Sequence, residues 1–448
     1  RDVELRNELL ERGKQLNWHP EHMRVRYLNW VEGLTGDWLI SRQRFFGVPI
    51  PVWYPLDAEG NPIYAEPIVP NEADLPIDPQ AEAPAGYVES QRNQPGGFMG
   101  DPDVMDTWAT SSLTPQIAGG WERDADLWQR VFPFDLRPQA HEIIRTWLFA
   151  TVVRAHLESD SLPFTDASIS GWILDPDRKK MSKSKGNVVT PMGLLDEHGS
   201  DAVRYWAASG RPGTDTAFDV GQMKIGRRLA IKILNSSKFA LSLGATLEKG
   251  EVTEALDQAM LADLAKVTEQ ATTAFHNFNY TKALEVTEQF FWRYCDDYLE
   301  LVKDRVYGAE GEAAAASARL ALGIATDTYL KLFAPFLPFV TDEVWSWWRS
   351  GSVHAETWPT ATSLRVGEGD VAVIDAVSEI LALLRKAKSD AKVSMKTEIS
   401  LARISAPAEK LAAARRAERD LLAAGRVSSV EWLVSDEVSV EAELVLAD

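Results

Sequence analysis

The segment "RKKMSKSKGN" (178–187) gathers positively charged side chains in a short stretch that also carries serines and a glycine. Lysine ammonium groups are compact charges that can follow a moving polyphosphate, and serine hydroxyls add hydrogen-bond donors. Gly186 allows the backbone to approach a ligand closely. Positive charge placed where negative charge grows is a large term in catalysis. The segment therefore indicates phosphate handling, although a solvated basic turn has the same composition.

The elements around this segment would present it to a ligand. Residues 164–174 have the pattern of a strand that ends at the basic segment, and residues 141–157 have a helical period. Thr190 and Pro191 have the types of a cap and a first helical residue. In doubly wound sheets, ligands bind beyond the carboxyl ends of the strands. The phosphate loop GxxxxGK[ST] does not occur in the sequence, which argues against a P-loop hydrolase.

The first part of the chain shows two further patterns. Residues 1–36 predict a helix followed by a connecting segment. Residues 37–54 predict a turn leading into a buried strand, in which Val48, Ile50, Val52 and Tyr54 alternate. Prolines and glycines concentrate in residues 55–102, which predicts an inserted region of loops and short edge strands.

The second part is helical and then mixed. Residues 223–350 carry long amphipathic stretches, and Cys295 falls among their apolar positions as a small core residue. A small α/β domain is predicted from a helix at 370–389, a strand at 398–404, a helix at 407–424, and strands at 429–435 and 438–446.

Composition limits the class of protein. The chain has 448 residues, of which 45% are hydrophobic, so two to four soluble globular domains are expected. The single cysteine excludes a disulfide framework and a cysteine-built zinc site, and no apolar run is long enough for a membrane span. The start is polar, unlike a signal peptide, and lacks Met, which predicts a piece of a longer chain. We expect a cytoplasmic protein without a membrane partner.

The formal net charge of −19 argues against a nucleic-acid partner only on average, because local patches decide binding. Lys224, Arg228 and Lys232 fall four apart, on one helical face beside an apolar series formed by Ile225, Leu229 and Ile233. Such a face can follow RNA phosphates, and it can equally be a plain solvated face.

Three aspartates, Asp101, Asp103 and Asp106, are close enough in sequence to suggest a metal cluster. A turn followed by a helix cap explains them better, because aspartate is favoured in both positions. No metal site is therefore predicted from the chain's own residues.

Several segments resemble the class I aminoacyl-tRNA synthetases. "KMSKS" (180–184) followed by "GN" is similar to the family's signature loop. "DWLISRQRFFGVPIP" (37–51) resembles the return from the inserted editing domain to the Rossmann core in the large Val/Ile/Leu enzymes. "DVMDTWATSS" (103–112) is similar to the valyl member of the family. "RPQAHEIIRTW" (137–147) resembles the adenylate-binding segment of valyl enzymes of archaeal and actinobacterial type. "KILNSSKFAL" and "FAPFLPFVTDEVW" resemble the two ends of the anticodon-binding bundle.

The resemblance implies a fold and a division into domains. The expected fold is α/β: the second half of a Rossmann-type parallel sheet, then an all-α anticodon-binding bundle and a small C-terminal α/β domain. Residues 1–222 would hold the catalytic part, including the tail of the editing domain (1–36), with residues 223–362 as the bundle and 363–448 as the last domain. The family's other nucleotide motif, HIGH, does not occur, so the resemblance implies a C-terminal fragment that is not active alone.

The resemblance also implies a reaction, in which valine is activated with ATP to valyl-adenylate and transferred to the 3′ end of tRNA(Val). Lys180 and Lys183 would act on the phosphates, Mg²⁺ would arrive with ATP, and the enzyme would be a monomer. The remaining implied ATP contacts are Met181, Ser182, Ser184, Gly171, Trp172 and Ile173. The implied adenylate and amino-acid contacts are Gln139, His141, Glu142 and Trp38, with a structural role for Trp38 equally compatible. Lys224, Arg228 and Lys232 would contact tRNA.

Two rival interpretations remain. An isoleucyl enzyme is disfavoured by "DVMDTWATSS" and by the absence of the cysteine set that many such enzymes use for zinc. A non-catalytic tRNA-binding module would be expected to have lost the "KMSKS" loop, which is intact in this sequence.

Overall fold

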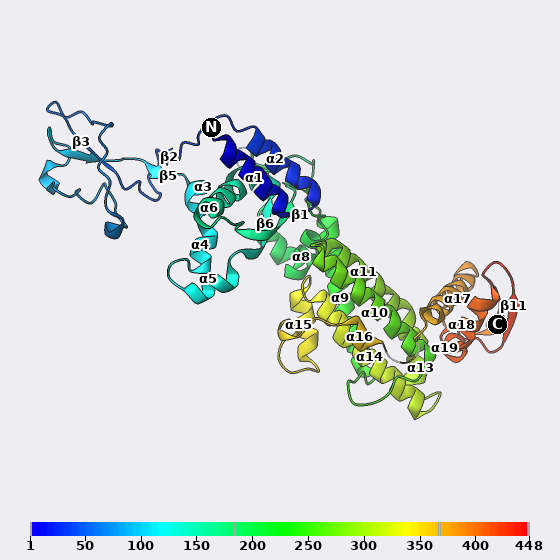
Figure 1. Ribbon diagram of the computed structural model, residues 1–448. Helices are drawn as coiled ribbons and strands as arrows, with labels where there is room; N and C mark the ends of the chain where they lie inside the picture. Colours follow the sequence, from blue (N-terminus) through cyan, green and yellow to red (C-terminus); the bar gives the residue numbers. More distant parts are fainter. Residues whose placement is uncertain (1, 183–184, 366, 368, 446–448) are drawn as a thin grey trace. The chain divides into compact units, whose positions relative to one another are not determined.

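The computed structural model describes residues 2–182, 185–365, 367 and 369–445, and it divides into two compact units. Unit 1 comprises residues 1–172 and 212–214, and unit 2 comprises residues 173–211 and 215–448. The units contain a parallel sheet, a helical bundle and a small C-terminal sheet, which confirms the expected fold class (Figure 1). None of the described helices is long and apolar enough to cross a membrane.

Unit 1 is built on a three-stranded parallel sheet with the order β1-β7-β6. Its strands are β1 (Asn17–His19), β7 (Phe164–Ser170) and β6 (Phe134–Ala140). The core beside it combines Trp18, Tyr27 and Phe164 with the helices α1 (Val3–Gln15), α2 (Arg24–Glu32) and α6 (Phe149–Ser159). At Gly13 a Cβ would overlap the ring of Tyr27, so the close approach of α1 to α2 requires a glycine.

The prediction for residues 1–36 missed a strand. The expected connecting segment contains β1, which pairs with β7 through Trp18 and Ala167. Three residues are too few to show a strand period, and the parallel partner that stabilises this strand lies 149 residues later in the sequence.

The prediction of a buried strand within residues 37–54 is also wrong. The segment contains two short strands, β2 (Ser41–Arg42) and the start of β3 (Trp53–Pro55), and Val48 is 51% exposed. Pro49 and Pro51 have no amide hydrogen to donate to a sheet, which explains why the alternating pattern forms no continuous strand.

The inserted region has the loops and short strands that its prolines and glycines predict. Strand β3 pairs antiparallel with β4 (Phe98–Gly100), and Trp53 and Phe98 are buried beneath the loops. Strand β5 (Val104–Met105) pairs with β2, and α3 (Thr107–Ser111) follows at once.

Unit 2 begins with a strand pair and continues into the bundle. Strands β8 (Ile173–Leu174) and β9 (Thr216–Ala217) are parallel, and α7 (Pro191–His198) and α8 (Ser200–Ala208) lie between them in sequence. The predicted strand 164–174 is therefore divided at Gly171 and Trp172. The main bundle helices are α9 (Val220–Ser242), α10 (Ala255–His276), α11 (Tyr280–Arg293), α14 (Glu312–Phe333) and α15 (Pro338–Ser346). Cys295 is buried among them, as predicted.

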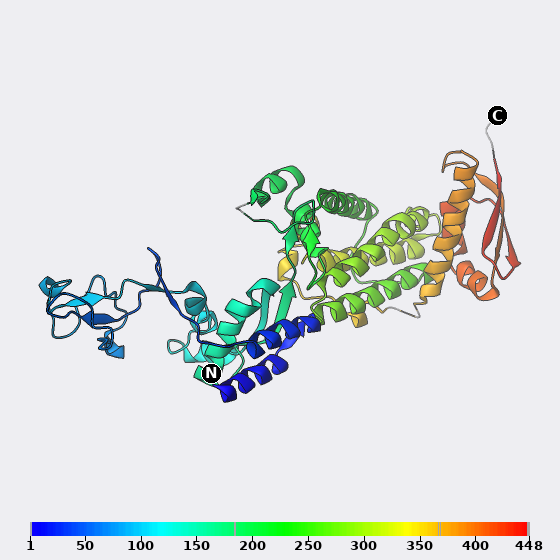
Figure 2. The same cartoon turned by 90° about the horizontal axis from the view of Figure 1, so that it is seen from above.

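The C-terminal layer joins three strands to three helices. Strand β10 (Ile399–Ala406) pairs parallel with β11 (Val430–Val434) and antiparallel with β12 (Ser439–Leu444). Helix α17 (Val371–Asp390) crosses the ends of the long bundle helices, with the strands on its far side (Figure 2). The helix predicted at 407–424 is two helices, α18 (Ala408–Arg415) and α19 (Glu418–Gly425).

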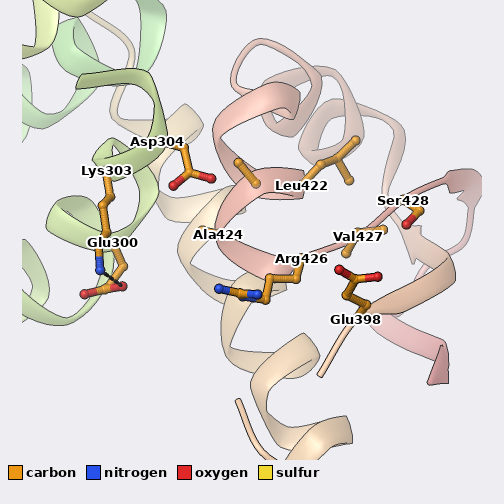
Figure 3. Close-up of a pocket in the computed structure, with 10 residues that line it drawn as sticks. Glu300, Lys303, Asp304, Glu398, Leu422, Ala424, Arg426, Val427 and Ser428 are labelled. Atoms are coloured by element: carbon orange, nitrogen blue, oxygen red, sulfur yellow. Dashed lines mark ion pairs between the residues drawn. The ribbon is translucent and has the colours of Figure 1, made fainter. Parts of the chain in front are cut away.

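A groove of about 440 Å³ opens where this layer meets the bundle (Figure 3). Glu300, Lys303 and Asp304 line one wall, and Glu398 and Arg426 line the other. The Lys303 Nζ lies 4.0 Å from a Glu300 carboxylate oxygen. Because both signs of charge are mixed, the groove has no preference for a polyphosphate.

Candidate active site

The residues expected to contact the adenylate follow the carboxyl ends of neighbouring strands in unit 1. Gln139 lies near the end of β6 and pairs in register with Ile169 of β7. His141 and Glu142 come directly after β6, and Gly171 and Trp172 come directly after β7. Parallel strands end at the same edge of a sheet, so two separate sequence segments meet there.

The backbone after β6 is not a regular α-helix. His141–Ile143 form a 3₁₀ turn and Ile144–Leu148 form a π-helical turn before α6 begins. A π-helical turn inserts an extra residue in a helix, and turns of this kind are frequent at functional sites. Ile144 and Leu148 are buried, so the turn is fixed on the core side while Glu142 stays exposed.

Gln139 offers a buried amide to this edge of the sheet. The side chain is 8% exposed, and within the described residues its Oε1 has no hydrogen-bond partner. A buried acceptor without a partner is unfavourable. The position therefore fits a ligand that donates a hydrogen bond, such as a ribose hydroxyl.

His141, Glu142 and Trp172 form one contact group. The Trp172 Nε1 donates a hydrogen bond to the Glu142 Oε2 over 2.9 Å. The rings of Trp172 and His141 are 4.7 Å apart between centroids, at an interplanar angle of 52°. The sequence placed the first two residues together, and the structure adds Trp172 from the other strand end.

A cavity of about 530 Å³ opens beside this group, inside unit 1. Four aromatic residues line it, Trp30, Trp38, Trp108 and Phe149. Its charged lining residues are Asp37, Arg42, Asp106, Glu142 and Arg145. An apolar cavity with a few polar groups is typical of a small-ligand site. Trp38 and Glu142, both expected at the substrate, therefore line the same cavity.

Arg42 and Asp106, which also line this cavity, form an ion pair. The Arg42 Nε lies 2.8 Å from the Asp106 Oδ2, and Asp106 caps α3 by accepting from the Trp108 backbone amide over 2.8 Å. Asp101 accepts from the Asp103 backbone amide in a turn. The turn and cap predicted for the three aspartates are confirmed. Arg42 was not predicted, and its pairing with a residue 64 positions later leaves no local signal.

A metal site built by the protein alone would bring several ligating side chains together. Within the described ranges, no three histidine, cysteine, aspartate or glutamate side chains are close enough to hold a metal ion.

The basic loop lies in unit 2, between β8 and α7. Lys180 is exposed, Met181 and Ser182 are partly buried, and Ile173 is 46% exposed at the start of β8. Lys183 and Ser184 lie outside the described residues. The loop's backbone returns to the strand, because Lys180 bridges to Leu174.

Asp175 and Asn187 hold this loop in shape. The Asp175 carboxylate accepts from the Lys179 amide over 2.7 Å and from the Asn187 Nδ2 over 2.8 Å. The Asn187 Oδ1 accepts from the Ser182 amide over 2.9 Å. The hydrogen bond from Asn187, followed by that from Lys179, lowers the pKa of Asp175. Sequence reasoning missed both roles, although the Asp and Asn residues flanking the lysines were a possible signal.

The basic face of α9 is formed as predicted, within unit 2. Leu229 and Ile233 are fully buried, while Lys224 and Arg228 are exposed. Lys232 differs, because its Nζ lies 3.2 Å from Asp296 and above the Trp292 ring. Two of the three cations are therefore presented to solvent.

Two family models match the chain. The first, "tRNA synthetases class I (I, L, M and V)", matches residues 1–219, and the second, "Anticodon-binding domain of tRNA ligase", matches residues 257–403.

Two relatives with about 60% identity to this chain are valine--tRNA ligases. The enzyme of Thermobifida fusca is 62% identical over 452 residues, which cover 100% of this chain and 51% of the relative. That of Salinispora tropica is 60% identical and covers 97% of this chain and 53% of the relative. The chain therefore spans about half the length of the relatives that it matches.

Solved structures agree on the fold. A leucyl-tRNA synthetase–tRNA complex of Agrobacterium radiobacter aligns with a TM-score of 0.59 at 19% identity, covering 89% of this chain and 51% of that one. The methionyl-tRNA synthetase of Mycobacterium tuberculosis, bound by methionyl-adenylate, aligns at 0.55 with 22% identity, covering 76% and 60%. At these identities the likeness shows the fold alone. The two family models, with the relatives at 62% and 60% identity, show that the chain belongs to the class I tRNA synthetase family.

Proposed function

We propose that the chain forms part of a valine--tRNA ligase, in which it supplies the basic loop, part of the adenylate site and the anticodon-binding bundle. The observation that carries this proposal is 62% identity to the Thermobifida fusca valine--tRNA ligase over the whole chain. The domain limits at 222 and 362, a monomeric state and a cytoplasmic location belong to the same proposal.

The first step is activation of valine. An oxygen of the valine carboxylate attacks the α-phosphorus of ATP, so that a phosphorus–oxygen bond forms and pyrophosphate leaves. Positioning and neutralised charge matter more than proton transfer in such displacements. Lys180 and Lys183 supply positive charge to the phosphates, and Met181, Ser182 and Ser184 support the loop. Mg²⁺ bound with ATP would neutralise further phosphate charge and take most of its ligands from phosphate oxygens.

The other residues hold the reactants. Glu142 binds the α-ammonium group of valine at the cavity wall, and Trp38 covers the apolar side. Gln139 accepts a hydrogen bond from a ribose hydroxyl. His141 lies beside the ribose. The backbone of Gly171, Trp172 and Ile173 contacts adenine.

The second step transfers the acyl group. A hydroxyl of the tRNA 3′-terminal ribose attacks the carbonyl carbon of valyl-adenylate, an ester forms and AMP leaves. Lys224 and Arg228, with Lys232, contact phosphates of the bound tRNA, while the helical bundle reads the anticodon.

A chimera tests this function directly. In it, the chain replaces the region that it matches in the Thermobifida fusca enzyme, which serves as the positive control. We expect valine-dependent ATP–pyrophosphate exchange and charging of tRNA(Val), and we expect Lys183→Ala to slow exchange by orders of magnitude. Faster exchange with isoleucine would overturn the choice of valine, and unchanged kinetics in the variant would refute the role of Lys183.

A further inference from the structure

Trp172 connects two separate parts of the site in unit 1. The residue follows the carboxyl end of β7, and its indole reaches the segment that follows β6. The Nε1 donates to the Glu142 Oε2 over 2.9 Å, and the ring lies against His141. A single side chain thus contacts two consecutive residues of the adenylate segment.

The chemistry of this contact suits a carboxylate that accepts hydrogen bonds. An indole N–H can only donate, so it bonds a carboxylate oxygen of Glu142 and cannot accept the proton of another group. Glu142 is exposed on the cavity wall, and a glutamate side chain has several rotamers. The hydrogen bond from the indole favours the rotamer in which the carboxylate meets Nε1, and the buried ring of His141, which is 8% exposed, lies against the indole.

We infer that Trp172 is a positioning residue that holds the Glu142 carboxylate where it receives the α-ammonium group of the amino-acid substrate. This inference rests on the proposed function. The proposed adenine contact uses the backbone of Trp172, whereas this positioning role uses its side chain. A residue that acts in this way affects amino-acid binding and leaves nucleotide binding almost unchanged.

The contact itself is tested on the chain as given, without any activity. The indole N–H of Trp172 should exchange slowly with solvent in NMR spectra, and Glu142→Ala should accelerate its exchange. Fast exchange in the unmodified chain would overturn the inference, since the hydrogen bond would then not persist in solution.

The positioning role is tested by a double-mutant cycle in the chimera. Trp172→Phe keeps an aromatic ring against His141 and removes the donor. We expect it to raise the KM for valine about tenfold, the effect of losing one hydrogen bond to a charged group, with the KM for ATP unchanged. In a Glu142→Ala background, Trp172→Phe should add nothing further to the KM for valine. Equal effects in both backgrounds would refute the inference, as would equal effects on valine and ATP.

Two more variants separate positioning from folding. Trp128→Phe makes the same change at a ring that stacks on Phe132, away from the cavity, and should leave both KM values unchanged. Glu142→Asp shortens the side chain, keeps its charge and leaves Trp172 intact, and it should raise the KM for valine as Trp172→Phe does. An unchanged KM in this variant would count against positioning. If the parent chimera shows no valine-dependent ATP–pyrophosphate exchange, the proposed function is wrong, and so is the role of Glu142 at the amino group. The hydrogen exchange of the indole N–H still tests whether Trp172 contacts Glu142.

Discussion

Arg305, on α13 (Lys303–Val306), donates from Nε to the Asp420 Oδ1 of α19 over 2.9 Å. The same guanidinium bonds both carboxylate oxygens of Asp257 on α10, each over 2.7 Å. Arg305 is 3% exposed and Asp257 is fully buried. The C-terminal layer is therefore joined to the helical bundle by a buried charge, which the two carboxylates compensate.

Removing one partner of this network should destabilise unit 2 strongly. Asp257→Asn leaves the Arg305 guanidinium buried with half of its compensation, and the expected loss of unfolding free energy is about 3–5 kcal/mol. Denaturant unfolding followed by far-UV circular dichroism measures it. Lys282→Met, which breaks an exposed pair with Glu285, is the control and should cost less than about 1 kcal/mol. Equal losses in the two variants would contradict this account.

The Asp175–Asn187 contact should determine how the basic loop responds to acid. The folded pKa of Asp175 lies below its ordinary value of 3.8, so its contribution to loop stability is present above that value. The contribution is lost as the pH falls through the lowered pKa. Asn187→Ala should raise the pKa of Asp175 toward 3.8, as an NMR titration of the carboxyl carbon would show. An unchanged pKa would mean that Asn187 does not hold the carboxylate in solution.

Cys295 should resist alkylation while the chain is folded. Burial raises the pKa of its thiol to about 12, so at about pH 8 only about one molecule in ten thousand carries the reactive thiolate. Iodoacetamide should modify the folded chain very slowly and the guanidinium-unfolded chain quickly, as mass spectrometry would record. Rapid modification of the folded chain would show that the bundle opens around this residue.

The sequence predicted those features that local pattern determines. The face of α9 follows from an apolar residue every three or four positions, and the cap at Asp106 follows from the residue type before a short helix. The resemblance placed His141 and Glu142 at the site, and the structure adds that they follow the carboxyl end of β6. In each case the signal lies within a few consecutive residues.

Long-range contacts could not be predicted in this way. The Trp172–Glu142 hydrogen bond joins residues 30 positions apart, and the Arg305–Asp420 pair joins residues 115 positions apart. Only the folded arrangement of strands and helices brings such partners together. The Asp175–Asn187 contact is closer in sequence, at 12 positions, and depends on the path of one loop.

Arg228 and Lys232, both on α9, should contribute unequally to tRNA binding. Arg228 is exposed, whereas Lys232 already lies 3.2 Å from Asp296 and above the Trp292 ring. A phosphate must compete with these partners for Lys232, while Arg228 can release a counterion from RNA at little cost. In a filter-binding assay, Arg228→Ala should reduce the slope of log affinity against log salt by about 1. Lys232→Ala should change it less, and a Lys232→Ala effect equal to or larger than that of Arg228→Ala would show that the Asp296 pair opens when RNA binds.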